Sequence, residues 1–267
     1  MAEQAEGPAR VGSAYETDVR GRAVIVTGAG QGIGRRYALE FARAGASVLV
    51  SDIDGDSAAS VAGEIAAEGG RAVAGVCDVG DAESTRAMAA QALDAFGRID
   101  VLINNAALFT PLGRCGFEDI ELDEWEAVMR VNVTGSMLCA RAVLPVMRAA
   151  KWGRIVNISS STVPLGLPFF LHYVTSKAAV IGMTRAMARE LGGDGITVNS
   201  VLPGLIETEI DNPGRTDALR QRVLDMQCVK ILGEPTNLVG MILFLASPAS
   251  GYLTGQSIAV DGGAVHL

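Results

Sequence analysis

The sequence predicts an α/β fold, with a single-domain, doubly wound parallel sheet of seven strands flanked by helices. Short runs rich in Val and Ile show little polar alternation, as strands buried on both faces do. They alternate with longer stretches whose apolar residues recur at helical spacing. The chain has 267 residues, of which 49% are hydrophobic, enough for one sizeable core. The expected strands are 23–27, 47–51, 71–76, 101–104, 154–159, 196–201 and 257–260.

The domain boundaries follow from what is absent between these elements. No Pro/Ser-rich linker or charge block divides residues 22–267, so we expect one domain there. Residues 1–21 are polar and lack the apolar core of a signal peptide, which predicts a flexible N-terminal arm. The sequence contains no run of about 18 apolar residues, so it does not predict a membrane-spanning helix.

Charge and cysteine usage narrow the choice of partners. The formal net charge is −8 and the sequence pI about 4.9, which argues against a nucleic-acid partner. The cysteines lack C-x-x-C or metal-ligand spacing, so we expect reduced thiols, a cytoplasmic location and no metal site. They are Cys77, Cys115, Cys139 and Cys228.

A glycine-rich turn, "TGAGQGIG", joins the first expected strand to the first expected helix. Glycines there permit a tight backbone and the close approach of a pyrophosphate to a helix N-terminus. An ordinary turn is the alternative in a chain with 32 glycines, and the spacing departs from G-x-G-x-x-G. The position between strand and helix favours dinucleotide binding. The glycines are Gly28, Gly30, Gly32 and Gly34.

The second expected strand leads directly into Asp52, eighteen residues after Gly34. An acidic side chain at this place accepts hydrogen bonds from the adenosine ribose hydroxyls of NAD, and it repels the 2′-phosphate of NADP. The following residues, Ile53 to Asp56, add acid and no Lys or Arg. The pattern predicts NAD in preference to NADP.

Polar residues also follow the third and fourth expected strands. Asp78 is a candidate for binding the adenine amino group, and a helix-capping Asp is a comparable alternative. Asn104 and Asn105 either satisfy loop backbone or contact the edge of a cofactor. The small Ala106 and Ala107 leave room beside them for a flat ring.

Tyr173 and Lys177, in "HYVTSK", are four residues apart, so on a helix they share a face. A surface Tyr stacked on a Lys stem is the simple alternative. The chain has 22 Lys plus Arg, yet only three are Lys, which favours a position that needs a compact, tunable ammonium. The neighbouring His172 points about 100° away around such a helix, and we expect it to pack or to face solvent.

Six motifs in order resemble those of the short-chain dehydrogenases/reductases, over residues 22–263. They are T-G-x-x-x-G-x-G at 27–34, N-N-A-A at 104–107, Asn132 in "MRVNVTG", Y-x-x-x-K at 173–177, "LPGLIET" at 202–208 and "GQSIAVDGG" at 255–263.

The resemblance implies a Rossmann fold and a catalytic set of Asn132, Ser160, Tyr173 and Lys177. Ser160 lies thirteen residues before Tyr173, with serines on both sides of it. A phenol with a pKa of about 10 is a poor base at neutral pH, so we expect Lys177 and a positive nicotinamide to lower it. Ser160 would hold the substrate oxygen, Lys177 the nicotinamide ribose, and Asn132 a water on the proton path.

The implied NAD site draws on the glycine turn, the strand ends and the segment after the sixth strand. It comprises Gly28, Gln31, Gly32, Ile33, Gly34, Asp52, Ile53, Asp78, Val79, Asn105, Ala106, Ala107, Tyr173, Lys177, Pro203, Gly204, Ile206 and Thr208.

Three segments would surround the substrate: 108–113, 162–171 and a lid at 205–232. The first two are largely apolar. They suggest a neutral, hydrophobic secondary alcohol or ketone. Three lid arginines, Arg215, Arg220 and Arg222, leave an anionic substrate group open. Candidates for a greasy cavity, or alternatively for core or subunit interface, are Leu165, Leu167, Phe169, Phe170 and Met226.

Three functions compete on this sequence. The first is an NAD-dependent short-chain alcohol dehydrogenase or ketone reductase. The second is an NADPH-dependent 3-oxoacyl thioester ketoreductase, against which Asp52 argues. The third is a non-catalytic dinucleotide sensor or scaffold, which would not need the proton-transfer residues. The resemblance also implies a homotetramer formed through helices around 121–150 and 173–192 and through the C-terminal segment. The apolar residues of these helices lie on more than one face.

Overall fold

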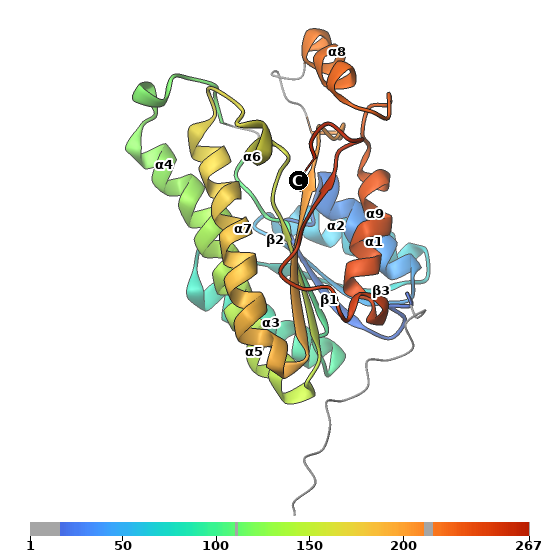
Figure 1. Ribbon diagram of the computed structural model, residues 1–267. Helices are drawn as coiled ribbons and strands as arrows, with labels where there is room; N and C mark the ends of the chain where they lie inside the picture. Colours follow the sequence, from blue (N-terminus) through green and yellow to red (C-terminus); the bar gives the residue numbers. More distant parts are fainter. Residues whose placement is uncertain (1–16, 110–111, 211–215, 267) are drawn as a thin grey trace, which may run out of the picture.

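The computed structural model describes residues 17–109, 112–210 and 216–266. It confirms the expected α/β fold with a seven-stranded parallel sheet (Figure 1). The strand order is β3-β2-β1-β4-β5-β6-β7. The strands are β1 (Ala23–Thr27), β2 (Ser47–Asp52), β3 (Arg71–Val76), β4 (Val101–Asn104), β5 (Gly153–Ile158), β6 (Ile196–Pro203) and β7 (Ser257–Val260).

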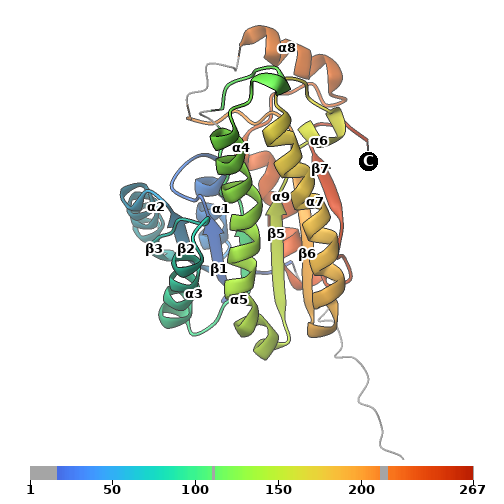
Figure 2. The ribbon, with the colours of Figure 1, turned by 90° about the vertical axis from the view of Figure 1, so that its left-hand side faces the viewer.

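Helices cover both faces of the sheet. Figures 1 and 2 show α1, α2 and α9 on one face, with α3, α5 and α7 on the other. Short turns and the isolated α8 lie near the carboxyl ends of the strands. The helices are α1 (Gly32–Arg43), α2 (Gly55–Ala67), α3 (Ala82–Phe96), α4 (Leu122–Met129), α5 (Ser136–Ala150), α6 (Thr162–Leu165), α7 (Leu171–Leu191), α8 (Asp217–Met226) and α9 (Pro235–Ala246), with a π-helical turn at Arg130–Gly135.

The core consists of two apolar layers, one on each side of the sheet. Every residue of β1, β4, β5 and β6 is buried, which explains why these strands read as continuous hydrophobic runs. The edge strands β3 and β7 are only partly covered. The sheet is therefore most rigid at its centre, where β1 and β4 pair.

The winding of the sheet reverses between β1 and β4. The chain first proceeds outward to β3 and then returns to pair β4 with the other edge of β1. Connections on either side of such a switch point leave in opposite directions, which opens a crevice beyond the strand ends. Here the Thr27 hydroxyl donates to the Ile103 carbonyl at 3.3 Å and accepts from the Asn105 N–H at 3.1 Å, which fixes the base of that crevice.

The ordered chain begins earlier than the sequence suggested. Residues 1–16 of the expected arm lie outside the described residues, but Val19, within the arm, is 1% exposed and belongs to the core. The Gly21 N–H donates to the Gly45 carbonyl at 2.9 Å. Residues 17–21 therefore pack on the domain, because a single apolar side chain finds a place between elements that are distant in sequence.

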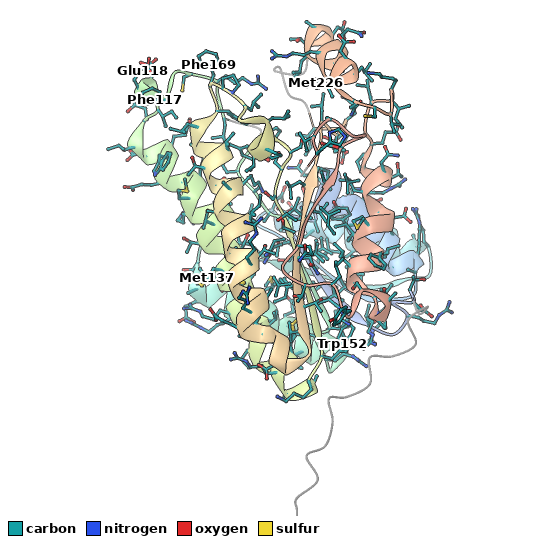
Figure 3. The ribbon with its side chains drawn as sticks, viewed as in Figure 1. Phe117, Glu118, Met137, Trp152, Phe169 and Met226 are labelled. Atoms are coloured by element: carbon teal, nitrogen blue, oxygen red, sulfur yellow. The ribbon has the colours of Figure 1, made fainter. Side chains whose placement is uncertain are left out.

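The helical run Leu122–Ala150 is long and apolar enough, by length and composition, to cross a membrane. Its α5 part instead packs into the core, where Cys139, Val143 and Met147 are fully buried. A half-exposed apolar stripe runs along the outer side of the same helical run. Its residues are Leu122, Trp125, Met129, Val133 and Met137, of which Figure 3 labels the last.

Candidate functional site

A cavity of about 1140 Å³ opens beyond the carboxyl ends of the central strands. Walls from the glycine turn, the ends of β2 to β6, and helices α7 and α8 enclose it. Of the sequence-predicted site residues, only Gly32 and Asn132 do not line it. Those that do are Gly28, Gln31, Ile33, Gly34, Asp52, Ile53, Asp78, Val79, Asn105, Ala106, Ala107, Ser160, Tyr173, Lys177, Pro203, Gly204, Ile206 and Thr208.

The glycine turn leaves no room for side chains. A Cβ on Gly34 would lie 2.1 Å from the Gly28 carbonyl oxygen and 2.5 Å from Nδ2 of Asn105. Gly28 itself has a φ of +62°, a conformation that favours glycine. The Asn105 amide donates to the carbonyls of Thr27 and Gly28, both at 3.0 Å. The glycine turn therefore places no side chain of its own between its backbone and a ligand, which fits the close approach of a pyrophosphate.

The N-terminus of α1 already holds an anion from the chain itself. The Gly32 N–H donates to Oε1 of Glu209 at 2.8 Å. Helix N-termini attract negative charge because their N–H groups are unpaired and the helix dipole points its positive end there. Sequence reasoning missed Glu209; its only signal was an acid directly after "LIET".

Asp52 stands in the cavity wall with its charge presented beside the glycine turn. Its Oδ2 accepts from the Gly30 N–H at 2.8 Å, and its Oδ1 from the Asp54 N–H at 3.1 Å. The next residue, Ile53, is 68% exposed and offers no positive charge. Asp52 and Ile53 therefore give this end of the cavity one carboxylate and no positive charge.

Asp78 is paired with a residue that the sequence did not point to. Arg130 Nη1 lies 3.0 Å from its Oδ2, and the Gly80 N–H donates to its Oδ1 at 2.8 Å. The helix-capping alternative for Asp78 is wrong, since Asp81 caps α3 by accepting from the Ser84 N–H.

The two neighbouring asparagines have different environments. Asn104 is buried, and its amide donates to the Ser136 carbonyl at 3.1 Å and to Oδ1 of Asn157 at 2.9 Å. Asn105 supports the glycine turn and lines the cavity. The alternation of side chains along the end of β4 sends the first into the protein and leaves the second at the crevice.

Helix α7 is attached to the end of β5 at the position of the predicted Tyr–Lys pair. The Lys177 ammonium donates to the Ile158 carbonyl at 2.8 Å, and the Ser159 hydroxyl donates to the Lys177 carbonyl at 2.8 Å. Lys177 is 3% exposed, and its Nζ lies 5.6 Å from the centroid of the Tyr173 ring. The pair faces the cavity and is not a surface stack.

Among the three consecutive serines, Ser160 is the one bonded to the phenol. A hydrogen bond with Ser160 acts to lower the pKa of Tyr173. Ser160 Oγ also accepts from the Thr162 N–H at 3.1 Å. Ser159 is instead used in holding α7, so the two neighbours are distinguished by their partners.

The titration of the pair differs from the sequence expectation. In the protein alone, burial raises the pKa of Tyr173 above its ordinary value and outweighs the hydrogen bond from Ser160. Burial also lowers the pKa of Lys177 to about 8, because it disfavours the charged ammonium. Lys177 therefore loses its proton before Tyr173 does.

Asn132 lies behind the cavity, in the π-helical turn. Its Oδ1 accepts from the Leu108 N–H at 2.7 Å, and its Nδ2 donates to the Ser176 hydroxyl at 3.0 Å. That hydroxyl donates in turn to the Tyr173 carbonyl at 2.8 Å. Asn132 thus connects the loop after β4 to the first turns of α7.

Aromatic rings surround the phenol on the substrate side. The ring centroids of Phe109 and Phe170 lie 5.0 Å and 4.9 Å from that of Tyr173. Of the cavity candidates, Leu165, Leu167, Phe170 and Met226 line the space. Phe169 does not, since it is 64% exposed on the rim, opposite Met226 in Figure 3.

His172 is fully buried, so of the two roles expected for it, packing and facing solvent, it has the packing role. Its Nε2 lies 2.8 Å from Oε1 of Glu124, and its ring packs edge-on against Phe170. Over the described ranges, no cluster of three or more His, Cys, Asp or Glu could hold a metal ion. Cys77, Cys115, Cys139 and Cys228 are free thiols.

Comparison with known proteins is consistent across nearly the whole chain. A family model described as "Enoyl-(Acyl carrier protein) reductase" matches residues 28–265. The chain is 41% identical over 247 residues, 92% of its length and 97% of the relative's, to the (2S)-[(R)-hydroxy(phenyl)methyl]succinyl-CoA dehydrogenase subunit BbsD of Thauera aromatica. It is 40% identical over 254 residues, 93% of its length and 99% of the relative's, to a 3-oxoacyl-[acyl-carrier-protein] reductase of Synechocystis.

Solved structures agree with this relationship. A 7α-hydroxysteroid dehydrogenase complexed with NADH and 7-oxo glycochenodeoxycholic acid superposes with a TM-score of 0.87 at 35% identity, covering 94% of this chain and 97% of that one. A putative gluconate 5-dehydrogenase from Beutenbergia cavernae with bound NADP gives 0.86 at 39% identity, covering 93% and 98%. The chain is therefore an oxidoreductase of the short-chain dehydrogenase/reductase family.

Proposed function

We propose that the protein transfers hydride between NAD(H) and a hydrophobic secondary alcohol or ketone, with Tyr173 as the acid/base. The observation that carries the proposal is the position of the phenol. It is hydrogen-bonded to Ser160, stands on the same helix face as Lys177, and borders a cavity that continues to the glycine turn. Apolar and aromatic walls around it suit a hydrophobic carbon skeleton.

The protein's part in the chemistry is to hold the substrate oxygen and to move one proton. A nicotinamide cofactor bound in the cavity would supply the hydride chemistry, as acceptor for an alcohol or donor for a ketone. Ser160 donates a hydrogen bond to the substrate oxygen and Tyr173 exchanges the proton with it. Lys177, redirected from the Ile158 carbonyl to a ribose hydroxyl, brings its positive charge to bear on the phenol.

Asn132 has a supporting role in this proposal. Because its side chain is already bonded to Leu108 and Ser176, it fixes the geometry of the π-helical turn next to the catalytic helix. A water held at this turn would continue the proton path from Lys177. The cytoplasmic location expected from the reduced cysteines stays a prediction.

A second candidate, reduction of 3-oxoacyl thioesters with NADPH, is supported by the names of several relatives, including the Synechocystis reductase. The carboxylate of Asp52 and the absence of a positively charged side chain at position 53, which is Ile53, weigh against NADPH. Solved relatives contain either cofactor, with NADP in one and NADH in another. A purely sensory role would leave the Ser160–Tyr173–Lys177 arrangement without a use. Cofactor choice is thus the first discriminating measurement.

We also infer a homotetramer. Leu122 is 74% exposed and begins the apolar stripe along α4 and α5, while Phe117 is 72% and Tyr252 99% exposed. Exposed apolar residues in one continuous stripe are typical of subunit interfaces.

The unaltered protein should bind NADH at least about tenfold more tightly than NADPH, roughly 1.4 kcal/mol, because Asp52 repels the added phosphate. Asp52→Asn keeps an oxygen acceptor for the Gly30 N–H and removes the charge, so it should narrow the ratio. Adding Ile53→Arg should narrow it further or reverse it. Fluorescence titration with both cofactors measures the ratio. Equal or tighter NADPH binding by the unaltered protein would show that the cofactor assignment is wrong.

Tyr173→Phe should lower turnover by about 10²–10⁴, the usual contribution of general acid–base catalysis. The ring still packs between Phe109 and Phe170, so thermal unfolding and NADH binding should be unchanged. The assay is NADH formation with a panel of secondary alcohols. Near-full turnover by a folded variant that binds NADH normally would refute the role of the phenol.

NADH binding should weaken as the pH rises above about 8. Below that pH the free protein carries protonated Lys177, which can donate to the ribose; above it the proton must be taken up on binding, at a cost approaching tenfold in Kd per pH unit. Lys177→Met should bind NADH more weakly and lose this pH dependence. Titrations from pH 6 to 10 test the point. If NADH binding by Lys177→Met still weakened with rising pH, the pH dependence would belong to another group.

Sedimentation equilibrium at micromolar concentration should give a mass near four chains of 27.7 kDa. Leu122→Glu, on the apolar stripe, should shift the population to smaller species, because it places charge in the interface. Leu93→Glu, on α3 and 38% exposed, makes the same change away from the stripe and serves as the control. A mass near one chain for the unaltered protein is the contradicting result.

A further inference from the structure

Helix α8 presents one arginine on an otherwise apolar face of the cavity. Leu219, Arg222, Val223 and Met226 line the space, and their spacing places them on a single side of the helix. A cavity wall for a purely hydrophobic substrate would not need a charge at this place. Figures 1 and 3 show α8 above the strand ends, with Met226 facing the rim that carries Phe117 and Phe169.

The other charged residues of α8 have partners within the chain. Arg220 pairs with Glu207 and Asp217, both at 3.0 Å, and Gln221 donates to Asp225 at 2.9 Å. Arg222 makes no hydrogen bond or ion pair with any residue in the described ranges. Arg215 of the same lid lies outside the described residues. The position of Arg222 therefore is not explained by the stability of the lid.

A second unpaired arginine lines the cavity from another segment. Arg114 belongs to the loop after β4, and its guanidinium carbon lies 5.8 Å from the centroid of Phe170. Phe170 contacts the Tyr173 ring, so Arg114 is separated from the reacting position by one aromatic side chain. Within the described part of the chain it has no carboxylate partner either.

The charges of the cavity are divided between its two ends. The acidic side chains that line it, Asp52 and Asp78, are at the adenosine end, and Asp78 is neutralised by Arg130. The substrate end has only Arg114 and Arg222 besides Lys177. In a protein of net charge −8, these two exposed guanidinium groups, which have no carboxylate partner among the described residues, give the substrate end of the cavity a positive potential that suits an anion.

From this arrangement we propose that the substrate carries an anionic group, a carboxylate or a phosphate, at the end remote from its carbonyl, and that Arg114 and Arg222 bind it. The inference rests on the proposed function and specifies its substrate class as hydrophobic oxo acids or thioesters. The apolar skeleton lies against Phe109 and Phe170, while the two guanidinium groups, one on the loop and one on the lid, hold the anion from separate segments.

Matched ketones separate charge from shape. The probes are para-acetylbenzoate, its homologue with a two-carbon spacer before the carboxylate, and the methyl ester of each, with acetoacetyl-CoA as the phosphate-bearing probe. For at least one acid the unaltered protein should show a kcat/KM at least about tenfold above that of its ester, the lower range for a charge-assisted hydrogen bond. Raising the salt concentration should reduce the ratio.

The variants assign this preference to residues. Arg222→Ala and Arg114→Ala should each reduce the acid-to-ester ratio mainly through KM, and Arg222→Glu should invert it. Arg86→Ala removes the same charge from α3, where Arg86 pairs only with Glu83, and should leave the ratio unchanged. If acetoacetyl-CoA alone depends on the two arginines, the anion is the phosphate; if the oxo acids do, it is the carboxylate.

Binding measured without turnover keeps this test independent of the proposed reaction. Saturation-transfer NMR with the protein and NAD should show the acids bound by the unaltered protein and more weakly bound by Arg222→Ala. If binding behaves so but no ketone is reduced, the proposed function fails and the anion site stands. Three results together would overturn the anion site. Acids and esters would bind the unaltered protein equally, Arg222→Ala would weaken both equally, and acetoacetyl-CoA would depend on neither arginine.

Discussion

The hydrogen bonds of Asn105 at the switch point of the sheet hold together the parts on which the site depends. This amide joins the end of β4 to the Thr27 and Gly28 carbonyls at the end of β1, and the backbone there comes too close for a side chain on Gly34. The turn is thereby held open to a ligand while the strands beneath it stay paired. Because β1 and β4 are the fully buried centre of the sheet, the glycine turn is placed on the most rigid part of the sheet.

Helix α7 is positioned by buried polar contacts and not by apolar packing alone. Lys177 and Ser159 join α7 to the end of β5, and Asn132 reaches it through Ser176. Farther along, Asn157 donates to Thr184 at 2.9 Å. Such bonds have directions, so they fix the rotation of the helix as well as its distance from the sheet. The same burial raises the Tyr173 pKa and lowers that of Lys177.

Negative and positive side chains lie at different ends of the cavity. Asp52 stands where ribose hydroxyls are expected, and Glu209 already binds the N-terminus of α1. The lid therefore contacts the N-terminus of α1 through Glu209, and it lines the opposite end of the cavity through Arg222.

The order of elements, the strand positions, the glycine turn and the Tyr–Lys pair could be predicted from the sequence, because buried parallel strands, tight turns and helix faces leave periodic local patterns. The roles of Asn104 and Asn105 depended on which way adjacent side chains point. Ser160 was chosen by its spacing from Tyr173, and the structure adds that it, among the three serines, is hydrogen-bonded to the phenol. Glu209, Arg130 and Arg114 left no local pattern, since their meaning lies in contacts, or in missing contacts, across long distances in sequence. Arg222 was noticed in the lid, but only the structure shows that it lines the cavity while Arg220 is paired. The direction of the Tyr173 pKa shift likewise was decided by the tertiary structure, because desolvation depends on everything packed around a group and not on its neighbours in the chain.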